Sequence, residues 1–297
     1  MNKINMENWI KAGKIASETR EYGLSLLKEG VKVIDVLEKI ERFIEGKGAG
    51  CAFPPQVSIN NIAAHYTSPL EDETILNKGD IVKLDLGVEI NGCVADTAKT
   101  VEISTKNHEK LIKASEEALA EAVKLVKPGT ELREIGKKID EIITKFGFHP
   151  IKNLSGHEIA EYNIHAGITI PNYDNGDSTR LKEGQIIAIE PFSTTGNGFV
   201  KEGKPSKIYR LVQLKQTRDQ TSRELMKYVY DRFKTLPFKE RQLLKKFSKI
   251  QIKLTLPKLE KENIIYQYPM LPEISNGLVA QTEHTLIVKK ESIITTL

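Results

Sequence analysis

The sequence predicts an α+β fold made of two duplicated halves, with a helical subdomain inserted into the second half. Two observations carry this prediction: a pattern of helices and alternating strands that occurs twice, and a basic block from Lys201 to Met270. The block holds 18 Lys and Arg against 7 Asp and Glu, a net charge of +11, whereas the rest of the chain sums to −7 and the whole chain to +4. This charge pattern indicates a segment with its own surface, inserted into an otherwise acidic protein.

The composition excludes several classes of protein. The chain has 297 residues, of which 39% are hydrophobic and 28% are charged, as in a folded globular protein. Its longest apolar runs, such as residues 186–189, are too short to cross a bilayer, and residues 1–8 contain no apolar signal segment. Two cysteines, Cys51 and Cys93, cannot form a disulfide framework and are expected to be reduced. We therefore expect a cytoplasmic protein that does not associate with membranes.

The first half begins with two helices and continues with a strand hairpin. Apolar residues recur at helical spacing in two segments, and Gly30 ends the first of them. A segment of alternating apolar and polar residues then leads to the tight-turn pair Asn91-Gly92, which predicts a returning strand. The expected elements are helices over residues 9–27 and 33–44, and strands over 79–87 and 93–103.

The same plan occurs again in the second half, with helices expected over residues 111–125 and 132–143 and a strand over 184–190. Gly30 has its counterpart in Gly129, 99 residues later, and Gly79, which opens the first alternating strand, has its counterpart in Gly184, 105 residues later. An acid follows Gly79 by six residues, and another follows Gly184 by six residues. Two features in the same order argue for duplicated halves related by a pseudo-twofold axis, with sheets meeting at an edge and helices on one face.

The basic block has a different pattern. Helices are expected over residues 222–234 and 238–247, on either side of a break at Leu236-Pro237, and the alternation of residues 251–256 predicts a strand. We therefore expect a small inserted subdomain over residues 201–270, and a main domain formed by residues 1–200 and 271–297. The basic surface is either a solvated face of the insert or a site for the phosphate backbone of ribosomal RNA.

Three acids lie where a surface carboxylate is not expected. Asp85 and Glu190 each stand between two apolar or proline neighbours, and Asp96 follows Asp85 by eleven residues, across the tight turn. Asp85 and Asp96 can therefore lie on one face of the hairpin. Burying a carboxylate is costly unless it is paired or bound to a cation. On Asp85 and Asp96 alone, a salt-bridged pair is the simpler interpretation.

The second half adds further ligand types. His157 and His165 lie eight residues apart in a segment punctuated by glycines, and Glu283 opens another alternating segment. The alternation directs the side chain of His284 away from that of Glu283. Four carboxylates and one imidazole suit two hard or borderline cations such as Mn, Fe(II) or Co better than a structural zinc.

At this point the sequence resembles a known family. Residues 60–69, 154–167, 188–192 and 281–285 are similar to motifs of the dinuclear methionine aminopeptidases, which adopt the pita-bread (creatinase/aminopeptidase-like) fold. The last two acids are 93 positions apart, and the basic block between them resembles the insert of the type 2 enzymes in their compact archaeal form. The positions that match the family's five metal ligands are Asp85, Asp96, His157, Glu190 and Glu283.

The resemblance implies an enzyme that removes the N-terminal methionine from nascent proteins, with a preference for a small second residue. Its reaction would be the attack of a water or hydroxide bridged by two divalent metal ions per chain, drawn from Co, Mn and Fe(II), with Zn and Ni also accepted. By the same resemblance Asp85 would chelate one metal, Asp96 and Glu283 would bridge both, and His157 and Glu190 would hold the other.

The resemblance also implies roles around the metals. Glu190 would move the proton of the attacking water, and His65 and His165 would contact the substrate. Phe53, Ile164 and Tyr268 align with the family's methionine pocket, although ordinary core packing explains Phe53 and Ile164 equally well. The expected partners are nascent polypeptide N-termini, with ribosome association through the basic insert, and the chain is expected to be a monomer.

Two alternatives stay open on the sequence alone. The first is a non-catalytic pita-bread protein that binds RNA or the ribosome, which the five competent ligand positions disfavour. The second is an Xaa-Pro peptidase, either a prolidase or an aminopeptidase P. Such enzymes generally carry a large N-terminal domain ahead of the catalytic one, which the short segment before Gly79 disfavours.

Overall fold

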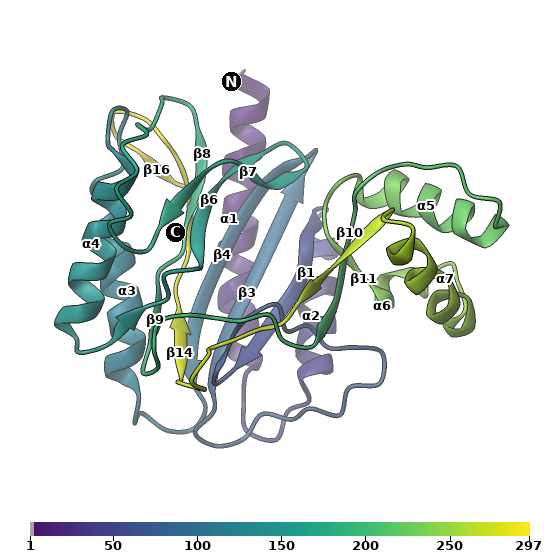
Figure 1. Ribbon diagram of the computed structural model, residues 1–297, viewed down its shortest axis with the longest axis horizontal. Coiled ribbons are helices and arrows are strands. Elements are labelled where there is room, and N and C mark those ends of the chain that lie inside the picture. Colours follow the sequence, from purple (N-terminus) through teal and green to yellow (C-terminus); the bar gives the residue numbers. More distant parts are fainter. Residues whose placement is uncertain (1–2) are drawn as a thin grey trace.

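Two α+β halves and a smaller subdomain at one side make up the molecule (Figure 1). The structure is a computed structural model that describes residues 3–297. Met1 and Asn2, the first residues of the stretch expected to lack a signal segment, lie outside the described residues. Within residues 3–297, no helix has both the length and the apolar character needed to cross a membrane.

The first half contains the predicted pair of helices and the predicted hairpin. At the hairpin turn Asn91 and Gly92 both have positive φ, 52° and 85°, which is the conformation that a two-residue turn between twisted strands requires. The apolar faces of both helices pack on the sheet of order β1-β3-β4. The elements are α1 (Lys3–Leu26), α2 (Val33–Gly46), β1 (Gly50–Ile59), β2 (Ile62–Ala64), β3 (Ile81–Ile90) and β4 (Cys93–Glu102).

The second half has the same helix pair, and its main sheet has the order β16-β15-β8-β6-β7. Strand β8 pairs with β15, which lies beyond the basic block in sequence, so the block separates two neighbouring strands of one sheet. The elements are α3 (Glu109–Val123), α4 (Leu132–Lys145), β5 (His149–Pro150), β6 (Ser155–Ala160), β7 (Asn163–Pro171), β8 (Ile186–Ile189), β9 (Phe192–Thr194), β13 (Leu271–Pro272), β14 (Val279–Gln281), β15 (His284–Ile287) and β16 (Ile293–Ile294).

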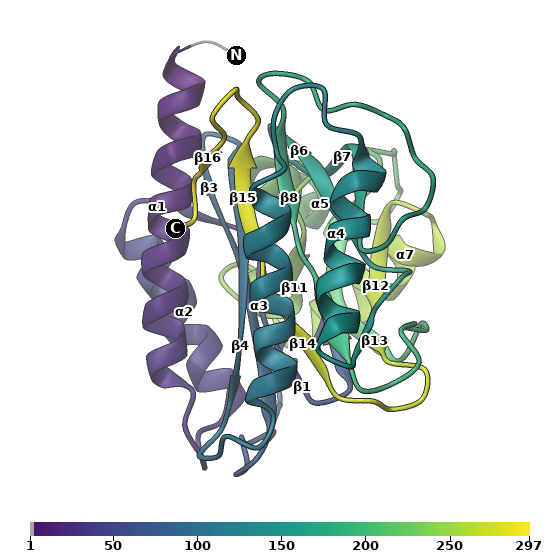
Figure 2. The same ribbon diagram turned by 90° about the vertical axis from the view of Figure 1, so that its left-hand side faces the viewer.

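Equivalent hydrogen bonds confirm that the halves are duplicated. Each of the four glycines aligned in the sequence has positive φ, and each donates its N–H to a main-chain carbonyl at the matching place in its half. Figure 2 shows α1 and α2 beside the strands of the first half, and α3 and α4 side by side in front of the strands of the second half. The four bonds, all 2.8 Å long, are Gly30 to Leu76, Gly129 to Leu181, Gly79 to Ile103 and Gly184 to Val288.

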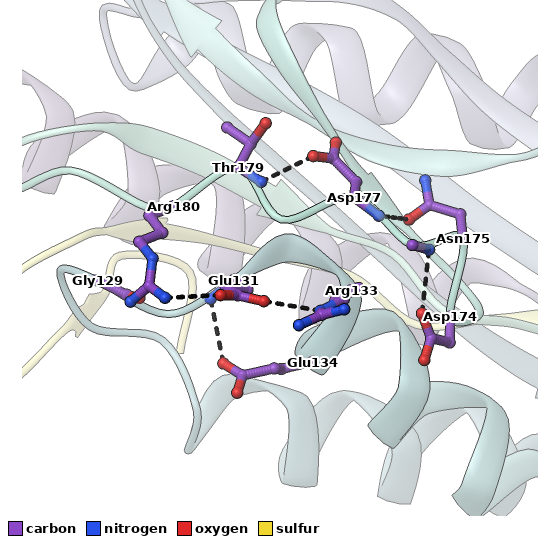
Figure 3. Close-up of polar contacts among 10 residues, drawn as sticks. Gly129, Glu131, Arg133, Glu134, Asp174, Asn175, Asp177, Thr179 and Arg180 are labelled. Carbon is purple, nitrogen blue, oxygen red and sulfur yellow. Dashed lines mark hydrogen bonds and ion pairs between the residues drawn. The ribbon is translucent and has the colours of Figure 1, made fainter.

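The loop over residues 174–180 fixes the start of α4 and the approach to β8 (Figure 3). Arg180 donates to Glu131 at 2.7 Å, and the Glu131 carboxylate also receives the Arg133 guanidinium at 2.7 Å. The N–H of Glu131 in turn donates to the Glu134 side chain at 3.1 Å. The loop also satisfies main-chain donors at the first turn of α4, which have no partner within the helix, because the Leu132 and Arg133 N–H groups donate to the Thr179 and Asp177 carbonyls, each at 3.0 Å.

The basic block forms a subdomain with a hydrophobic cluster of its own, in which Phe238 and Val229 are fully buried. The helix predicted over 222–234 is present as α5 (Gln220–Phe233). The helix predicted over 238–247 is mostly wrong, because its first two residues form β11 (Phe238–Lys239) and only α6 (Glu240–Leu243) is helical. Two further strands of this subdomain were not predicted, β10 (Pro205–Leu211) and β12 (Ile265–Pro269), and both pair in the sheet of order β11-β10-β12.

The strand predicted over 251–256 is also wrong, because these residues belong to the helix α7 (Lys249–Lys261). Ser248 caps the helix, and its own N–H donates to Oε1 of the Gln251 side chain at 2.9 Å. The residues that α7 buries are Ile252, Thr255, Leu256 and Leu259, which follow helical spacing. Leu254, whose position suggested alternation, is 71% exposed.

Candidate active site

All five predicted metal ligands line one pocket at the meeting of the two halves. Asp85 lies on β3 and Asp96 on β4, His157 lies on β6, and Glu190 and Glu283 adjoin β8 and β15. The residues that line the pocket are Phe53, Gln56, His65, Asp85, Asp96, His157, Ile164, His165, Glu190, Ile208, Pro237, Tyr268 and Glu283.

The ligand atoms converge closely enough for one cation to reach several of them. His157 Nε2 lies 3.8 Å from Asp96 Oδ2 and 3.6 Å from Glu190 Oε1. Ligand atoms of Asp96, His157 and Glu283 all lie within 4.8 Å of one another, and these three residues are buried. Strands from both halves are therefore needed to assemble the cluster.

Mutual repulsion and burial make the carboxylates difficult to ionise without a cation. Burial raises the pKa of Asp85 to about 7. Burial, with the neighbouring carboxylates, also raises the pKa values of Asp96, Glu190 and Glu283 well above their ordinary range. Among the described residues, none of the four forms an ion pair with Lys or Arg.

Several of these groups also lack hydrogen-bond partners. Oδ1 of Asp85, Oδ1 of Asp96 and Oε1 of Glu283 are buried without a protein donor. A buried acceptor without a partner is costly, and cations that prefer oxygen ligands would satisfy it. The residues present therefore fit a divalent metal centre, with an imidazole as the one nitrogen ligand.

The two other predicted histidines face the same pocket. His65 has a positive φ of 68°, its N–H donates to Gln56 Oε1 at 2.6 Å, and its Nδ1 lies 2.9 Å from the Pro269 carbonyl. The ring of His165 packs edge-on against that of His157, with centroids 4.5 Å apart. Burial lowers the pKa of His65, and burial together with nearby groups that include Arg210 lowers that of His165 to about 4. Both imidazoles are therefore neutral at pH 7.

The three predicted pocket residues lie beside this cluster. Phe53 and Ile164 are buried, and both belong to one hydrophobic cluster and also line the pocket. The two interpretations of these residues, core packing and pocket lining, are therefore compatible. Tyr268 stacks edge-on against His65, with ring centroids 5.4 Å apart. The structure adds Ile208 and Pro237 from the basic subdomain, which the sequence did not single out.

Two glutamines at the site were also missed. Gln56 holds the main chain of His65, and Gln281 donates from Nε2 to Glu190 Oε2 at 3.3 Å. The only sequence signal for Gln281 was its place in the alternating segment before Glu283. His284 contacts Thr296 through Nδ1 and lines a different cavity, so its side chain points away from the cluster as predicted.

Comparisons with known proteins agree along the whole chain. Residues 7–290 match the sequence profile of metallopeptidase family M24. A protein of Pyrococcus abyssi called methionine aminopeptidase is 46% identical over 294 residues, which cover 99% of each chain. One of the same name from Methanocaldococcus jannaschii is 42% identical over 287 residues, covering 97% of this chain and 96% of the relative.

Solved structures at low sequence identity share the fold. A thermophilic Arx1 superposes with a TM-score of 0.87 at 18% identity, over 99% of this chain and 91% of that one. The methionine aminopeptidase of Thermotoga maritima gives 0.73 at 21% identity, over 100% and 98%. A prolidase from Pyrococcus furiosus gives 0.65 at 19% identity, over 100% of this chain and 64% of that one. The predicted pita-bread fold is thereby confirmed, and with the match over residues 7–290 the chain belongs to metallopeptidase family M24.

Proposed function

We propose that this chain is a methionine aminopeptidase that removes the N-terminal methionine from newly made proteins whose second residue is small. The observation that carries the proposal is the group of four carboxylates and an imidazole that lines one pocket together with apolar side chains, with Asp96, His157 and Glu283 buried. The archaeal relatives called methionine aminopeptidase, at 42–46% identity over nearly the full length, support the same activity.

The metal ligands in this proposal are Asp85, Asp96, His157, Glu190 and Glu283. Their oxygen-rich set fits two divalent ions such as Mn, Fe(II) or Co, and the same ligands accept Zn or Ni. Bound metal would supply a water whose pKa lies near neutrality and would polarise the scissile carbonyl. The compact type 2 assignment rests on the basic subdomain over residues 201–270, which would separate the two parts of the catalytic domain.

The protein's own groups handle protons and orientation. The Glu190 carboxylate would accept the proton of the attacking water and deliver it to the leaving amine. Gln281 holds one oxygen of that carboxylate at 3.3 Å and so limits its rotation. The neutral imidazole of His165 would donate a hydrogen bond to the substrate carbonyl as negative charge develops on it. The single N–H of neutral His65 is directed at the Pro269 carbonyl, so its Nε2 would accept a hydrogen bond from an N–H of the substrate.

Recognition of methionine would fall to the apolar side of the pocket. Phe53 and Ile164 supply rigid buried surface, and Tyr268 closes the side next to His65. A flexible thioether side chain fits such a surface through dispersion contacts. Ile208 and Pro237 bring the basic subdomain to the same pocket, so the insert would form one of its walls.

The proposed partners are nascent N-termini met by a monomer in the cytoplasm, where the free thiols of Cys51 and Cys93 would remain reduced. Ribosome association through the basic subdomain is part of the proposal, but its lysines are not equally available. Lys245 pairs with Glu45 at 2.8 Å, Lys249 pairs with Glu71 at 3.3 Å, and Lys246 lies over an aromatic ring. Salt-dependent binding to ribosomes would therefore depend on other cations, such as Lys253 and Lys261 on the outer side of α7.

The test is hydrolysis of Met-Ala-Ser by the full chain, with Mn(II), Co(II) or Fe(II) added after treatment with a chelator. We expect metal-dependent release of methionine and little cleavage of an Xaa-Pro peptide. No release with any of the three metals would favour the non-catalytic alternative, and preferential cleavage of the Xaa-Pro peptide would favour a prolidase-like enzyme.

A further inference from the structure

The two carboxylates proposed to bridge the metals come from strands that are hardly paired with each other. Asp96 lies on β4, Glu283 adjoins β15, and these strands belong to different sheets. One isolated backbone bridge, from the Glu283 N–H to the Ala98 carbonyl at 2.9 Å, joins them at this point. Hydroxyl groups of threonine side chains form further hydrogen bonds between these two parts of the chain.

The hydroxyl of Thr285 holds both main-chain groups of Asp96. It donates to the Asp96 carbonyl at 2.8 Å and accepts from the Asp96 N–H at 2.8 Å. Thr285 is fully buried, so water cannot replace these bonds. The position of the Asp96 backbone is thereby tied to a residue two places beyond Glu283.

Two other threonines repeat this arrangement from the opposite strand. Thr97 donates to the Glu283 carbonyl at 3.0 Å. Thr100 donates to the Gln281 carbonyl at 2.7 Å and accepts from the Gln281 N–H at 2.8 Å. Thr97, Thr100 and Thr285 are defined here as the threonine seam.

Residues of α1 and of the C-terminal segment form hydrogen bonds with the threonine seam. Arg20 donates from Nη1 to the Thr97 hydroxyl at 2.6 Å and to the Thr296 carbonyl at 3.0 Å. The Thr296 hydroxyl accepts from the Thr285 N–H at 3.1 Å. A Cβ placed on Gly13 of α1 would lie 2.2 Å from the Thr295 carbonyl oxygen, so α1 needs glycine there to let the segment pass.

We propose that the threonine seam, locked by Arg20 and Thr296, is a positioning device that sets the spacing of Asp96 and Glu283 for metal binding. The inference rests on the proposed metal ligand set. Ligand atoms of Asp96 and Glu283 lie within 4.8 Å of one another although their strands belong to different sheets, so a small shift of one strand would change their spacing and weaken metal binding. Thr285 acts through the backbone of Asp96, Thr97 through that of Glu283 and Thr100 through that of Gln281, so all three are positioning residues.

Replacing Thr285 with valine keeps the shape of the side chain and removes the hydroxyl. Titration of the metal-free chain with Mn(II) by calorimetry should then show roughly 10–100-fold weaker binding at one site or both, the effect typical of losing an outer contact to a metal ligand. Thr285→Ser keeps the hydroxyl and should bind Mn(II) nearly as the unchanged chain does. Thr130→Val is the matched control, because Thr130 is buried and donates to the Leu125 carbonyl at 2.7 Å in a loop before α4.

The outcomes separate positioning from mere stability. Unchanged Mn(II) affinity in Thr285→Val, even with a lower melting temperature, would overturn the proposal, as would equal losses in the valine and serine variants. If Thr285→Val does not fold, Thr97→Val measured against Thr97→Ser decides on the same criteria. Failure of the proposed function itself would be seen differently, as an unchanged chain that neither binds Mn(II) nor releases methionine.

Discussion

The Glu190 side chain has two proposed roles, which are to bind metal and to transfer a proton. It is only 14% exposed, which raises its pKa, and the charges of Asp96 and Asp85 raise that pKa further. Glu190→Gln keeps the size of the side chain and removes the acid. We expect kcat for Met-Ala-Ser to fall by about 10²–10⁴-fold, the usual contribution of a positioned acid or base.

The same variant should not be less stable when metal is absent. Removing one of several repelling buried carboxylates relieves repulsion, so the melting temperature of the metal-free chain should stay level or rise. Glu183→Gln, an exposed acid just before β8, is the control and should leave kcat unchanged. Full activity of Glu190→Gln in saturating metal would remove Glu190 from the proposed mechanism.

Protons and cations compete for Asp85, whose pKa in the metal-free protein is about 7. Below pH 7 a cation must displace a proton, so the apparent Mn(II) affinity should weaken about tenfold per pH unit for each displaced proton. Calorimetry at pH 6.5 and 8.0, in buffers of different ionisation enthalpy, measures that proton release directly. Binding without proton release at pH 6.5 would contradict the assignment of these acids.

Stability without metal should follow the opposite trend with pH. A carboxyl whose pKa is raised by folding stabilises the folded state when protonated, and this contribution is lost as pH rises through the folded-state pKa. The metal-free chain should therefore melt at a lower temperature at pH 8.0 than at pH 6.5. His157, with a pKa lowered to about 3, opposes this trend, because its imidazole binds protons near pH 6.5 only in the unfolded state. We expect the raised pKa values of the four carboxyls to outweigh this contribution.

The metal ligands could be predicted at the level of single residues because each acid stood out against apolar neighbours. Gln56 and Gln281 could not, because an amide in an alternating segment has no unusual burial cost. The role of Gln281 depends on its 3.3 Å bond to Glu190, which is 91 residues away in sequence, and the role of Gln56 depends on how the chain folds back to bring the His65 N–H within 2.6 Å. The type of a residue predicts a functional role when burying its side chain would cost much free energy, and it gives no such signal when that cost is small.

At the scale of elements, Glu273 connects the two chain segments that lead into and out of the basic subdomain. It is fully buried and accepts main-chain N–H groups from Asn197 at 2.7 Å, Ser275 at 2.7 Å and Gly277 at 2.8 Å. Glu273→Gln would turn an NH2 group toward these donors. We expect the free energy of unfolding in urea to fall by about 3 kcal/mol, the size of a lost charged hydrogen bond. Glu202→Gln, exposed in the same region, should cost far less, and equal losses would show that Glu273 has no special role.

The elements of the subdomain were harder to predict than those of the halves. In α7, Ile252, Leu254 and Leu256 fit a strand and a helix equally well over six residues, and Pro257 suggested an end. The helix forms because Ile252, Leu256 and Leu259 pack together in the subdomain core, while Leu254 stays outside. Strand β10 was missed because its pairing partners, β11 and β12, lie about 30 and 60 residues further along the chain.

At the scale of the whole molecule, the acidic halves and the basic subdomain meet through a few ion pairs. Glu41 of α2 binds both Lys239 of β11 and Arg241, and a cleft of about 760 Å³ lies beside these residues. Lys239 is fully buried, with its side chain 2% exposed. Some acids of the two halves and some cations of the basic subdomain therefore form ion pairs that join these parts of the molecule.

Glu41→Gln would leave the Lys239 ammonium buried with weaker compensation. Breaking a buried pair by removing one partner costs about 3–5 kcal/mol, so we expect a loss of that order in the free energy of unfolding. Lys239 pairs in the sheet with Ile208, which lines the active-site pocket. Loosening this contact should raise KM for Met-Ala-Ser more than it lowers kcat, and should increase hydrogen exchange in β10 and β11.

Glu45→Gln is the matched control, since Glu45 lies on the same helix and also pairs with two cations of the subdomain. Its partners Arg232 and Lys245 are 41% and 53% exposed, and such surface pairs contribute about 0–1 kcal/mol. We therefore expect Glu45→Gln to leave stability, KM and exchange close to those of the unchanged chain. Equal effects of the two variants would mean that net charge, and not the buried Glu41–Lys239 contact, holds the subdomain against the catalytic halves.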